Sequence, residues 1–464
     1  MIPLTIAEIA GIVDGRLHDA PDPGMIVDAP PAADSREVVP GGLFAAIQGE
    51  RTDGHHHAAR AIAQGAVAVL ASRPAGCPAI VVPDVVKALG MLARSVHAQL
   101  HPVTVGITGS VGKTTTKDLL AAILEADGPT VATARSYNNE LGLPLTVLRA
   151  GPQTRYLVLE MGAGRKGDIT YLTGIAPPQL GVVLKVGHAH IRTLGSLDGV
   201  AEAKAELPGA LPDASRGGIA VLNADDPRVA AMAQHTRAQV TWFGQAGDAV
   251  VGAEDVSLDE AGRARFLLRT PAGSAPVQLQ VLGVHQVHNA LAAAAAAWSL
   301  GIPPGQVAQV LGETTRRAPG RLEVLAAPGG VTVLNDAYNA NPDSMQAALH
   351  TLSAMAAGRR TIAVLGEMTG QADASSERHE EIGRLTARLG VDVLVAVGAD
   401  DPAVMAAAAR EEGGPGMVVK QAPDRGAALA LARGLLRDGD VVLVKASSEL
   451  GLTQLAADLS KGEA

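Results

Sequence analysis

The sequence predicts an α/β protein built of three domains, and three observations lead to this prediction. A chain of 464 residues is too long for one hydrophobic core and corresponds to about three domains. Short runs of Val, Leu and Ile alternate with helical patterns, which favours parallel sheets covered by helices. Breaks in this alternation fall near His101-Pro102 and at Thr314–Pro319. We therefore place the domains at residues 1–98, 99–315 and 316–464.

The first domain is predicted to be a small α/β unit. Its buried-strand candidates are Val67–Leu70 and Ile80–Val82, and its helical patterns cover Ala58–Gln64 and Val85–Leu100. The size of this segment lies within the usual range for a domain.

The central domain is predicted to hold a parallel sheet. Residues 239–282 alternate polar and apolar residues between Gly and Pro breaks, which indicates an antiparallel extension of that sheet. A helix is expected over Asn289–Leu300; the apolar stretch Ala290–Trp298 within it is too short to span a bilayer. The predicted strands of this domain are Val103–Thr108, Tyr156–Met161, Leu180–Val186 and Gly218–Asn223.

The C-terminal domain is predicted to be a second parallel α/β unit with a Rossmann-like fold. Its strands are separated by helical patterns, as the βα alternation of such a fold requires. The predicted strands are Val331–Asn335, Thr361–Leu365, Asp392–Val397 and Asp440–Lys445.

Composition narrows the class of protein. The net charge of −9 argues against broad nucleic-acid binding, which needs a basic surface. Cys77 is the only cysteine, so no intrachain disulfide forms and a reducing cytoplasm is expected. The N-terminus lacks a basic segment followed by an apolar one, so we expect neither a signal peptide nor membrane insertion.

Residues 106–117 predict a phosphate-binding loop between a strand and a helix. They read Gly-Ile-Thr-Gly-Ser-Val-Gly-Lys-Thr-Thr-Thr-Lys, directly after the β-like run Val103–Val105. Gly109 and Gly112 let the backbone approach phosphate oxygens, Lys113 can reach the β- and γ-phosphates, and the Thr114 hydroxyl can bind Mg²⁺. The strict pattern places Gly where Ile107 stands, yet the strand–loop–helix context predicts ATP as the cofactor.

Three polar groups follow strands of the central domain or lie on its helices, and each has a second interpretation. Glu160 ends a strand at the edge where ligands of parallel sheets bind, but it could be a solvated carboxylate. His188 and His190 follow the next strand at the same edge and could contact a metal or phosphate, or be structural. Lys204, between Glu202 and Glu206, fits the solvated face of an amphipathic helix.

Two further clusters also leave alternatives open. His55-His56-His57 could suggest a metal site, but three adjacent histidines rarely point at one ion, so a loop role is favoured. The run from Asn335 to Pro342 follows a strand of the third domain. It is either a turn or a loop that contacts a nucleotide.

Taken together, these motifs resemble the Mur ligase family, ATP-dependent amide-forming enzymes of bacterial cell-wall synthesis, over nearly the whole chain. Asn138–Thr146 and Asp336–Met345 are similar to the branch that adds D-alanyl-D-alanine. Sister ligases that add single amino acids usually carry a histidine-bearing version of the second segment. Asp34-Ser35-Arg36, Pro40–Phe44 and Gly49–His55 are similar to the family's UDP-substrate domain.

The resemblance implies roles for individual residues. The expected nucleotide contacts are Thr108, Gly109, Ser110, Val111, Gly112, Lys113, Thr114, Asn289, Arg321, Asn335, Asp336 and Tyr338. The expected Mg²⁺ ligands are Thr114, Glu160, His190 and Lys204, the last as a carbamate, and Lys113, Glu160, His190 and Lys204 are the expected catalytic residues. The expected substrate contacts are Ser35, Arg36, Phe44, Asp53, Asn138 and Asn139.

The implied reaction is ligation of D-alanyl-D-alanine to the terminal carboxylate of a UDP-linked muramoyl tripeptide, in peptidoglycan precursor synthesis. ATP would activate the carboxylate as an acyl phosphate, and Lys113 with Mg²⁺ would spread the charge on the phosphoryl oxygens. A cytoplasmic monomer is expected. Closure of the third domain would then exclude water from the acyl phosphate.

The sequence also departs from the family pattern. Ala446-Ser447-Ser448 stands where Gly-Ser-Arg is usual, Thr369-Gly370-Gln371 replaces Glu-Leu-Gly, and His57 replaces a common aromatic residue. Three alternatives therefore stay open: a related ligase that adds a single amino acid, a P-loop switch or transport ATPase, and a cell-wall-related binding protein. The sequence holds neither a guanine-reading Asn-Lys-x-Asp motif nor an ABC signature, which the second alternative requires.

Overall fold

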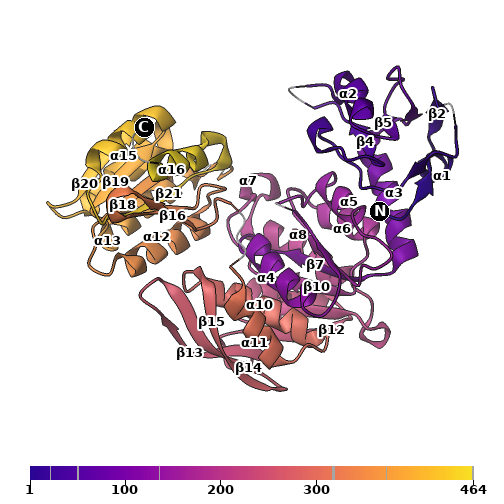
Figure 1. Ribbon diagram of the computed structural model, residues 1–464. Coiled ribbons are helices and arrows are strands. Elements are labelled where there is room, and N and C mark those ends of the chain that lie inside the picture. The colour runs from indigo at the N-terminus through magenta and orange to yellow at the C-terminus, as the bar shows by residue number, and fades with distance from the viewer. Residues whose placement is uncertain (21, 50–51, 135, 316–318, 372–373, 462–464) are drawn as a thin grey trace.

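The computed structural model describes the chain except residues 21, 50–51, 135, 316–318, 372–373 and 462–464. Three α/β units follow one another, each with its own main sheet, and the middle unit lies between the other two (Figure 1). The predicted three-domain α/β fold is confirmed. Glu50 and Arg51 of the segment 49–55, and the expected boundary at residue 316, lie outside the described residues.

The first unit is built on a four-stranded sheet with the order β2-β6-β5-β4, in which only β2 is antiparallel to its neighbour. The predicted strands and helices all form, with strand bounds shifted by one residue. The expected boundary after residue 98 falls in the last turn of α3. The elements are β1 (Leu4–Thr5), α1 (Ile6–Ile12), β2 (Arg16–His18), β3 (Ile26–Val27), β4 (Leu43–Ala46), α2 (Ala58–Ala63), β5 (Ala68–Ala71), β6 (Ala79–Val81) and α3 (Val85–Leu100).

The middle unit holds a nine-stranded sheet with the order β15-β14-β13-β12-β11-β10-β7-β9-β8. Its strands are β7 (Val103–Thr108), β8 (Thr130–Ala132), β9 (Tyr156–Glu160), β10 (Leu180–Val183), β11 (Ile219–Asn223), β12 (Gln239–Gly244), β13 (Val251–Leu258), β14 (Arg263–Thr270) and β15 (Gly273–Leu282).

Two predictions about this sheet need correction. The antiparallel extension begins later than residue 239, because β12 pairs parallel with β11 and only β13, β14 and β15 form hairpins. The chain crosses between β11 and β12 through helical turns, so both strands run in one direction, whereas tight turns join β13, β14 and β15. Strand β10 ends at Val183 rather than Val186, since Leu184 and Lys185 bend to contact the phosphate-binding loop.

Helices cover both faces of the middle sheet. Helices α4, α10 and α11 share one apolar core with Val105 and Ile107, while α5, α6 and α8 share another with Leu157 and Leu159. In the described part of the chain, no helix is both long enough and apolar enough to cross a membrane. The helices are α4 (Lys113–Glu125), α5 (Gly142–Val147), α6 (Asp168–Ile175), α7 (Ile191–Leu194), α8 (Leu197–Gly209), α9 (Pro227–Ala231), α10 (Gln286–Ser299) and α11 (Pro304–Glu313).

The C-terminal unit has a six-stranded sheet with the order β16-β17-β21-β18-β19-β20, parallel except for the edge strand β16. Helices α12, α13 and α14 pack on one face, and α15 and α16 on the other, which is the predicted Rossmann-like arrangement. The elements are β16 (Glu323–Ala327), β17 (Val331–Asn335), α12 (Pro342–Ala356), β18 (Thr361–Gly366), α13 (Ser375–Arg388), β19 (Val393–Val397), α14 (Asp400–Glu412), β20 (Val418–Ala422), α15 (Arg425–Leu435), β21 (Val441–Lys445) and α16 (Leu452–Ser460).

Candidate active site

The phosphate-binding loop connects the carboxyl end of β7 to the start of α4. Strand β7 is an interior strand of the middle sheet, between β10 and β9. The first N–H groups of a helix have no partner within the helix, so this position attracts anions. The neighbouring segment after β10 holds the loop in place. Ser110 donates its backbone N–H to the Lys185 carbonyl at 2.8 Å, and its Oγ accepts from the Gly187 N–H at 2.8 Å.

Gly112 is required at the end of this loop for two reasons. Its φ of +84° lies in the left-handed region, which side chains disfavour. A Cβ at this position would stand 2.2 Å from Oδ1 of Asn289, at the start of α10. The Asn289 side chain therefore lies directly against the loop.

Gly112→Ala is expected to weaken ADP binding by about 100-fold, because the clash with Asn289 displaces the loop from its phosphate-binding geometry. Titration calorimetry with ADP measures this loss. The matched control is Gly167→Ala, which has the same kind of strain at φ +95° but no atom within 4 Å of a new Cβ. Equal losses of ADP affinity in the two variants would contradict the role of the close contact.

A cavity of about 760 Å³ extends from the loop into the space between the middle and C-terminal units. The predicted nucleotide contacts that line it are Ser110, Val111, Gly112, Lys113, Thr114, Asn289, Arg321, Asp336 and Tyr338. Other predicted nucleotide contacts and metal ligands are described by the structure but do not line the cavity. These are Thr108, Gly109, Asn335, Glu160, His190 and Lys204. The cavity thus combines the phosphate-binding loop with side chains of the C-terminal unit.

Cations gather where the loop faces this cavity. The half-buried Lys113 donates from Nζ to the Gly109 carbonyl at 2.9 Å. Burial lowers the pKa of its ammonium group, an effect that the Glu160 carboxylate opposes and the Arg321 guanidinium reinforces. A desolvated cation beside a second cation favours a bound anion such as a phosphate.

Arg321 belongs to the C-terminal unit and lines the same cavity as the phosphate-binding loop. Its guanidinium lies 4.3 Å from the centre of the Tyr338 ring and donates to Ser136 Oγ at 3.2 Å. Its Nε is buried and has no hydrogen-bond partner among the described residues. Because an unpaired buried donor is costly, this group is suited to an anionic ligand.

Asp336 and Asn335 play different parts in the C-terminal unit. The Asp336 carboxylate accepts from Lys445 Nζ at 2.6 Å and from the Leu322 N–H at 3.0 Å, and it lines the cavity. The buried Asn335 side chain instead donates to Glu323 at 3.0 Å. Asn335 therefore supports the strand end rather than facing the cavity.

Glu160 is a buried carboxylate and not the solvated one that its position also allowed. It is 1 % exposed, and its two oxygens accept from Thr114 Oγ1 at 2.9 Å and from Asn138 Nδ2 at 2.7 Å. A hydroxyl and a carboxylate oxygen side by side match the hard oxygen ligands of Mg²⁺. Asn138, an expected substrate contact, holds this carboxylate in place.

Lys204 is buried on α8 at 2 % exposure, so its interpretation as a residue of a solvated helix face is wrong. Burial first, and the charge of Lys113 second, lower the pKa of its amine to about 7. His190 is exposed at the start of α7 with a φ of +61°, and the pKa of its imidazole is lowered by desolvation and by Lys113 and Lys204. Lys113, Lys204 and His190 therefore lie close enough to influence one another.

The remaining expected substrate contacts lie apart from the cavity. Ser35 and Phe44 are buried in the first unit, and the exposed Arg36 pairs with Asp34 at 2.6 Å. Asp53 accepts from His55 and pairs with Arg73, which holds the pKa of this carboxyl well below its usual range. Asn139 accepts from the Gly142 N–H at 2.9 Å.

The first histidine of the run has protein partners for both of its ring nitrogens. His55 is buried between Asp53 and Ser72, to which its two ring nitrogens bond at 2.6 and 3.2 Å. No group of three or more His, Cys, Asp or Glu residues in the described ranges could hold a metal ion. Residues 54–57 form a 3-10 helix that leads directly into α2, rather than the expected loop.

Two departures from the family pattern lie together in the C-terminal unit. The Thr369 N–H donates to Ser447 Oγ at 2.9 Å, which joins the segments 369–371 and 446–448. Ser448 is exposed and is not one of the described residues that line the cavity. Ser448 therefore makes no contribution of its own to the lining of this cavity.

Several cavity residues could not be identified from sequence motifs. His288 bonds to Asp225 at 2.8 Å, and the Asp225 carboxylate also accepts from the backbone of Gln245 and Ala246. Across the domain interface, Lys185 pairs with Asp343 at 2.8 Å. Asp343 lies within the segment 336–345 identified above, but its partner Lys185 is far away in the sequence. The only local signal for Asp225 is the Asp-Asp-Pro sequence that leads into α9.

The three units match three descriptions of one family. Residues 32–97 match "Mur ligase family, catalytic domain", residues 107–297 match "Mur ligase middle domain", and residues 320–448 match "Mur ligase, glutamate ligase domain". An ATP-dependent ligase of this architecture fits the loop, the cavity and the buried carboxylate described above. The chain belongs to the Mur ligase family.

Individual relatives narrow the similarity to one branch. The chain is 46 % identical to UDP-N-acetylmuramoyl-tripeptide–D-alanyl-D-alanine ligase of Mycobacterium tuberculosis (strain ATCC 25618 / H37Rv), over 98 % of this chain and 97 % of the relative. It is 35 % identical to the ligase of the same name from Escherichia coli (strain K12), with 88 % of each chain covered.

Solved structures agree in fold. The crystal structure of MurF from Acinetobacter baumannii superposes with a TM-score of 0.85 at 32 % identity, covering 99 % of both chains. MurF ligase of Thermotoga maritima in complex with ADP superposes with a TM-score of 0.77 at 28 % identity, covering 93 % of this chain and 96 % of that one.

Proposed function

We propose that this chain is an ATP-dependent ligase that joins D-alanyl-D-alanine to the terminal carboxylate of UDP-N-acetylmuramoyl-tripeptide in peptidoglycan synthesis. The single observation that carries this proposal is the end-to-end similarity to ligases of that name, at up to 46 % identity. The phosphate-binding loop, the interdomain cavity and the buried Glu160 supply the chemistry that such a reaction needs.

The charged and polar groups that line the cavity suit ATP. Lys113 and the free Nε of Arg321 offer positive charge beside the N-terminus of α4, where the phosphates belong. Asp336, Tyr338 and Asn289 then surround the rest of the nucleotide. Because Arg321 and Tyr338 belong to the C-terminal unit, binding favours closure of that unit over the cavity and excludes water.

Mg²⁺ fits the oxygen atoms next to the loop. Thr114 and Glu160 would hold one ion, and His190 with a carbamylated Lys204 would hold a second. When bound, these ions would offset the repulsion between the triphosphate and the tripeptide carboxylate. The lowered pKa of Lys204 supplies a neutral amine that can add to CO₂, and the resulting anion would relieve its repulsion with Lys113.

The reaction then proceeds in two transfers. The tripeptide carboxylate takes the γ-phosphoryl group, giving an acyl phosphate and ADP, and the amine of D-alanyl-D-alanine displaces phosphate to form the amide. Lys113 holds the phosphoryl oxygens during the first transfer, and Arg321 keeps the nucleotide in place beside Tyr338.

The first unit would bind the UDP portion of the substrate through the neighbourhood of Ser35, Arg36 and Asp53. The Arg36 guanidinium is exposed there, which suits contact with a diphosphate.

We further propose the domain boundaries 1–98, 99–315 and 316–464, a monomeric state and a cytoplasmic location. The boundaries follow the order of the sheets, and the location follows from the single cysteine, Cys77, which suits a reducing compartment.

A panel of acceptors tests the proposed function. With UDP-N-acetylmuramoyl-tripeptide and ATP, D-alanyl-D-alanine is expected to support ADP release at least tenfold faster than D-alanine, L-lysine or D-glutamate, since a dipeptide site must hold both residues. ADP release with a single amino acid alone would favour the related ligase. ADP release independent of both peptide substrates would favour a switch or transport ATPase.

A further inference from the structure

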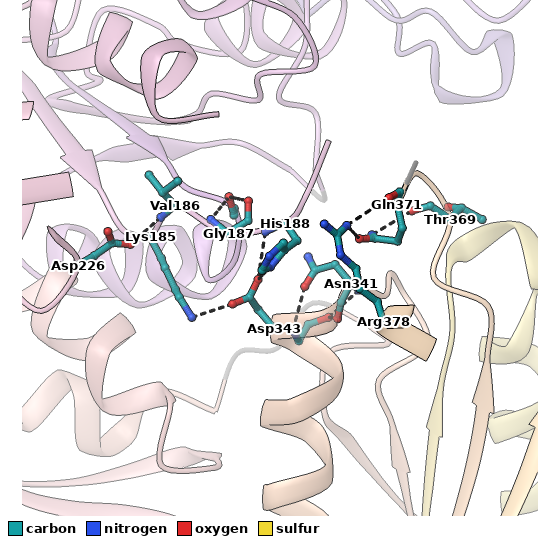
Figure 2. A network of polar contacts seen from close by, with 12 residues as sticks. Lys185, Val186, Gly187, His188, Asp226, Asn341, Asp343, Thr369, Gln371 and Arg378 are labelled. Carbon is teal, nitrogen blue, oxygen red and sulfur yellow. Dashed lines mark hydrogen bonds and ion pairs between the residues drawn. The ribbon is translucent and has the colours of Figure 1, made fainter. Parts of the chain in front are cut away.

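One carboxylate of the C-terminal unit reaches the segment that connects β10 to His190. Asp343 lies in the first turn of α12, which begins with a capping box between Asn341 and Ser344. Its Oδ1 accepts from Lys185 Nζ at 2.8 Å. Figure 2 shows this contact crossing from the C-terminal unit to the middle unit.

The same carboxylate also contacts the backbone of the segment. Asp343 Oδ2 accepts from the His188 N–H at 3.2 Å and lies 3.4 Å from His188 Nδ1. A Cβ on Gly187 would stand 2.4 Å from this oxygen, so only glycine permits the approach. Asp343 thus contacts three residues of this segment, Lys185, Gly187 and His188, rather than a single side chain.

Segment 185–188 is tied to the phosphate-binding loop on its other side. The Ser110 hydroxyl bonds to both the N–H and the carbonyl of Gly187, at 2.8 and 3.1 Å. The Val186 N–H donates to Asp226 Oδ2 at 2.9 Å. His190 follows two residues after His188, with the constrained φ of +61°. The position of His190 therefore depends on how segment 185–188 is held; Figure 2 shows this segment between Asp226 and Asp343.

We propose that Asp343 is a positioning residue that couples closure of the C-terminal unit to the placement of His190 beside Lys113 and Lys204. This inference rests on the proposed function. When the C-terminal unit docks, its carboxylate fixes Lys185 and the His188 N–H, and the segment then presents His190 to the reacting groups. When that unit moves away, the segment loses two of its charge-assisted contacts, so an open enzyme does not assemble the complete site.

The test compares Asp343→Asn, Asp343→Glu and Lys185→Met with a matched control. The control is Asp400→Asn, which removes an exposed first-turn acid from α14 in the same unit. Asp343→Asn is expected to lower kcat about tenfold. The dissociation constant for ADP, measured by calorimetry, should change less than threefold, because the phosphate-binding loop is intact. Asp343→Glu should recover part of kcat, and the control should match wild type.

A double variant makes the test specific for the pair. If Asp343 acts through Lys185 and its segment, Lys185→Met with Asp343→Asn should be no slower than Asp343→Asn alone. Multiplied losses, an unchanged kcat in Asp343→Asn, or equal losses in kcat and ADP affinity would each overturn the inference. Failure of the proposed function is distinguishable, since wild-type protein would then release no ADP with the two peptide substrates.

Discussion

Lys113→Ala is expected to abolish ADP release with both peptide substrates present. The Lys113 ammonium lies at the start of α4 and lines the cavity together with Arg321, where we propose that the phosphates bind. It is the loop cation nearest the transferring group in our account. Removing such a preorganised charge costs about 10³-fold or more in kcat.

The fold should survive this substitution. Burial already lowers the pKa of Lys113, so the folded protein holds this charge at a cost and does not gain stability from it. We therefore expect the midpoint of thermal unfolding to stay within a few degrees of wild type. Lys87→Ala, on the exposed face of α3, is the control and should retain full ADP release. Normal turnover by Lys113→Ala would end the proposed mechanism.

Lys204→Ala is expected to be almost inactive and to recover partly when small carboxylic acids are added. The buried side chain leaves a space next to Lys113, and acetate or formate could place a carboxylate there in the manner of the carbamate. ADP release measured against acetate concentration reports the rescue. The same acids should not rescue Lys113→Ala, which controls for general effects. Full activity of Lys204→Ala without added acid would remove the carbamate from the mechanism.

The pH dependence of the modification follows from the direction of the pKa shift. Only the neutral amine adds to CO₂, and the pKa of Lys204 is lowered to about 7, so the reactive form grows as pH rises through 7. Protein kept with ¹³C-labelled bicarbonate at pH 8 should show a carbamate carbonyl signal that is absent in Lys204→Ala and weaker at pH 6.

The fold was predictable where a strand is buried on both faces. Strands β7 and β17 are continuous apolar runs, which is the pattern that parallel central strands require, and both were found at the predicted residues. Some edge strands were missed because they carry few apolar residues. Strand β20, for example, is mostly exposed and carries Lys420 and Gln421, so it lacks an apolar run.

The candidate site was predictable where its chemistry is local in sequence. Gly112, Lys113 and Thr114 are adjacent, and Glu160 ends the strand beside β7, so both signals could be found by inspection. The burial of Lys204 could not be predicted, because the pattern of residues 200–207 is that of a half-exposed helix. The packing of α8 against the sheet buries this side chain. The pairing of Lys185 with Asp343 joins residues 158 positions apart, and no local pattern records it.

A crystal structure of the protein with a non-hydrolysable ATP analogue and Mg²⁺ tests the central claim most directly. Our account predicts the triphosphate against the backbone N–H groups of residues 109–114, with Lys113 on its terminal phosphate and Arg321 closing over it from the C-terminal unit. A nucleotide bound elsewhere, with this loop empty, would contradict the account.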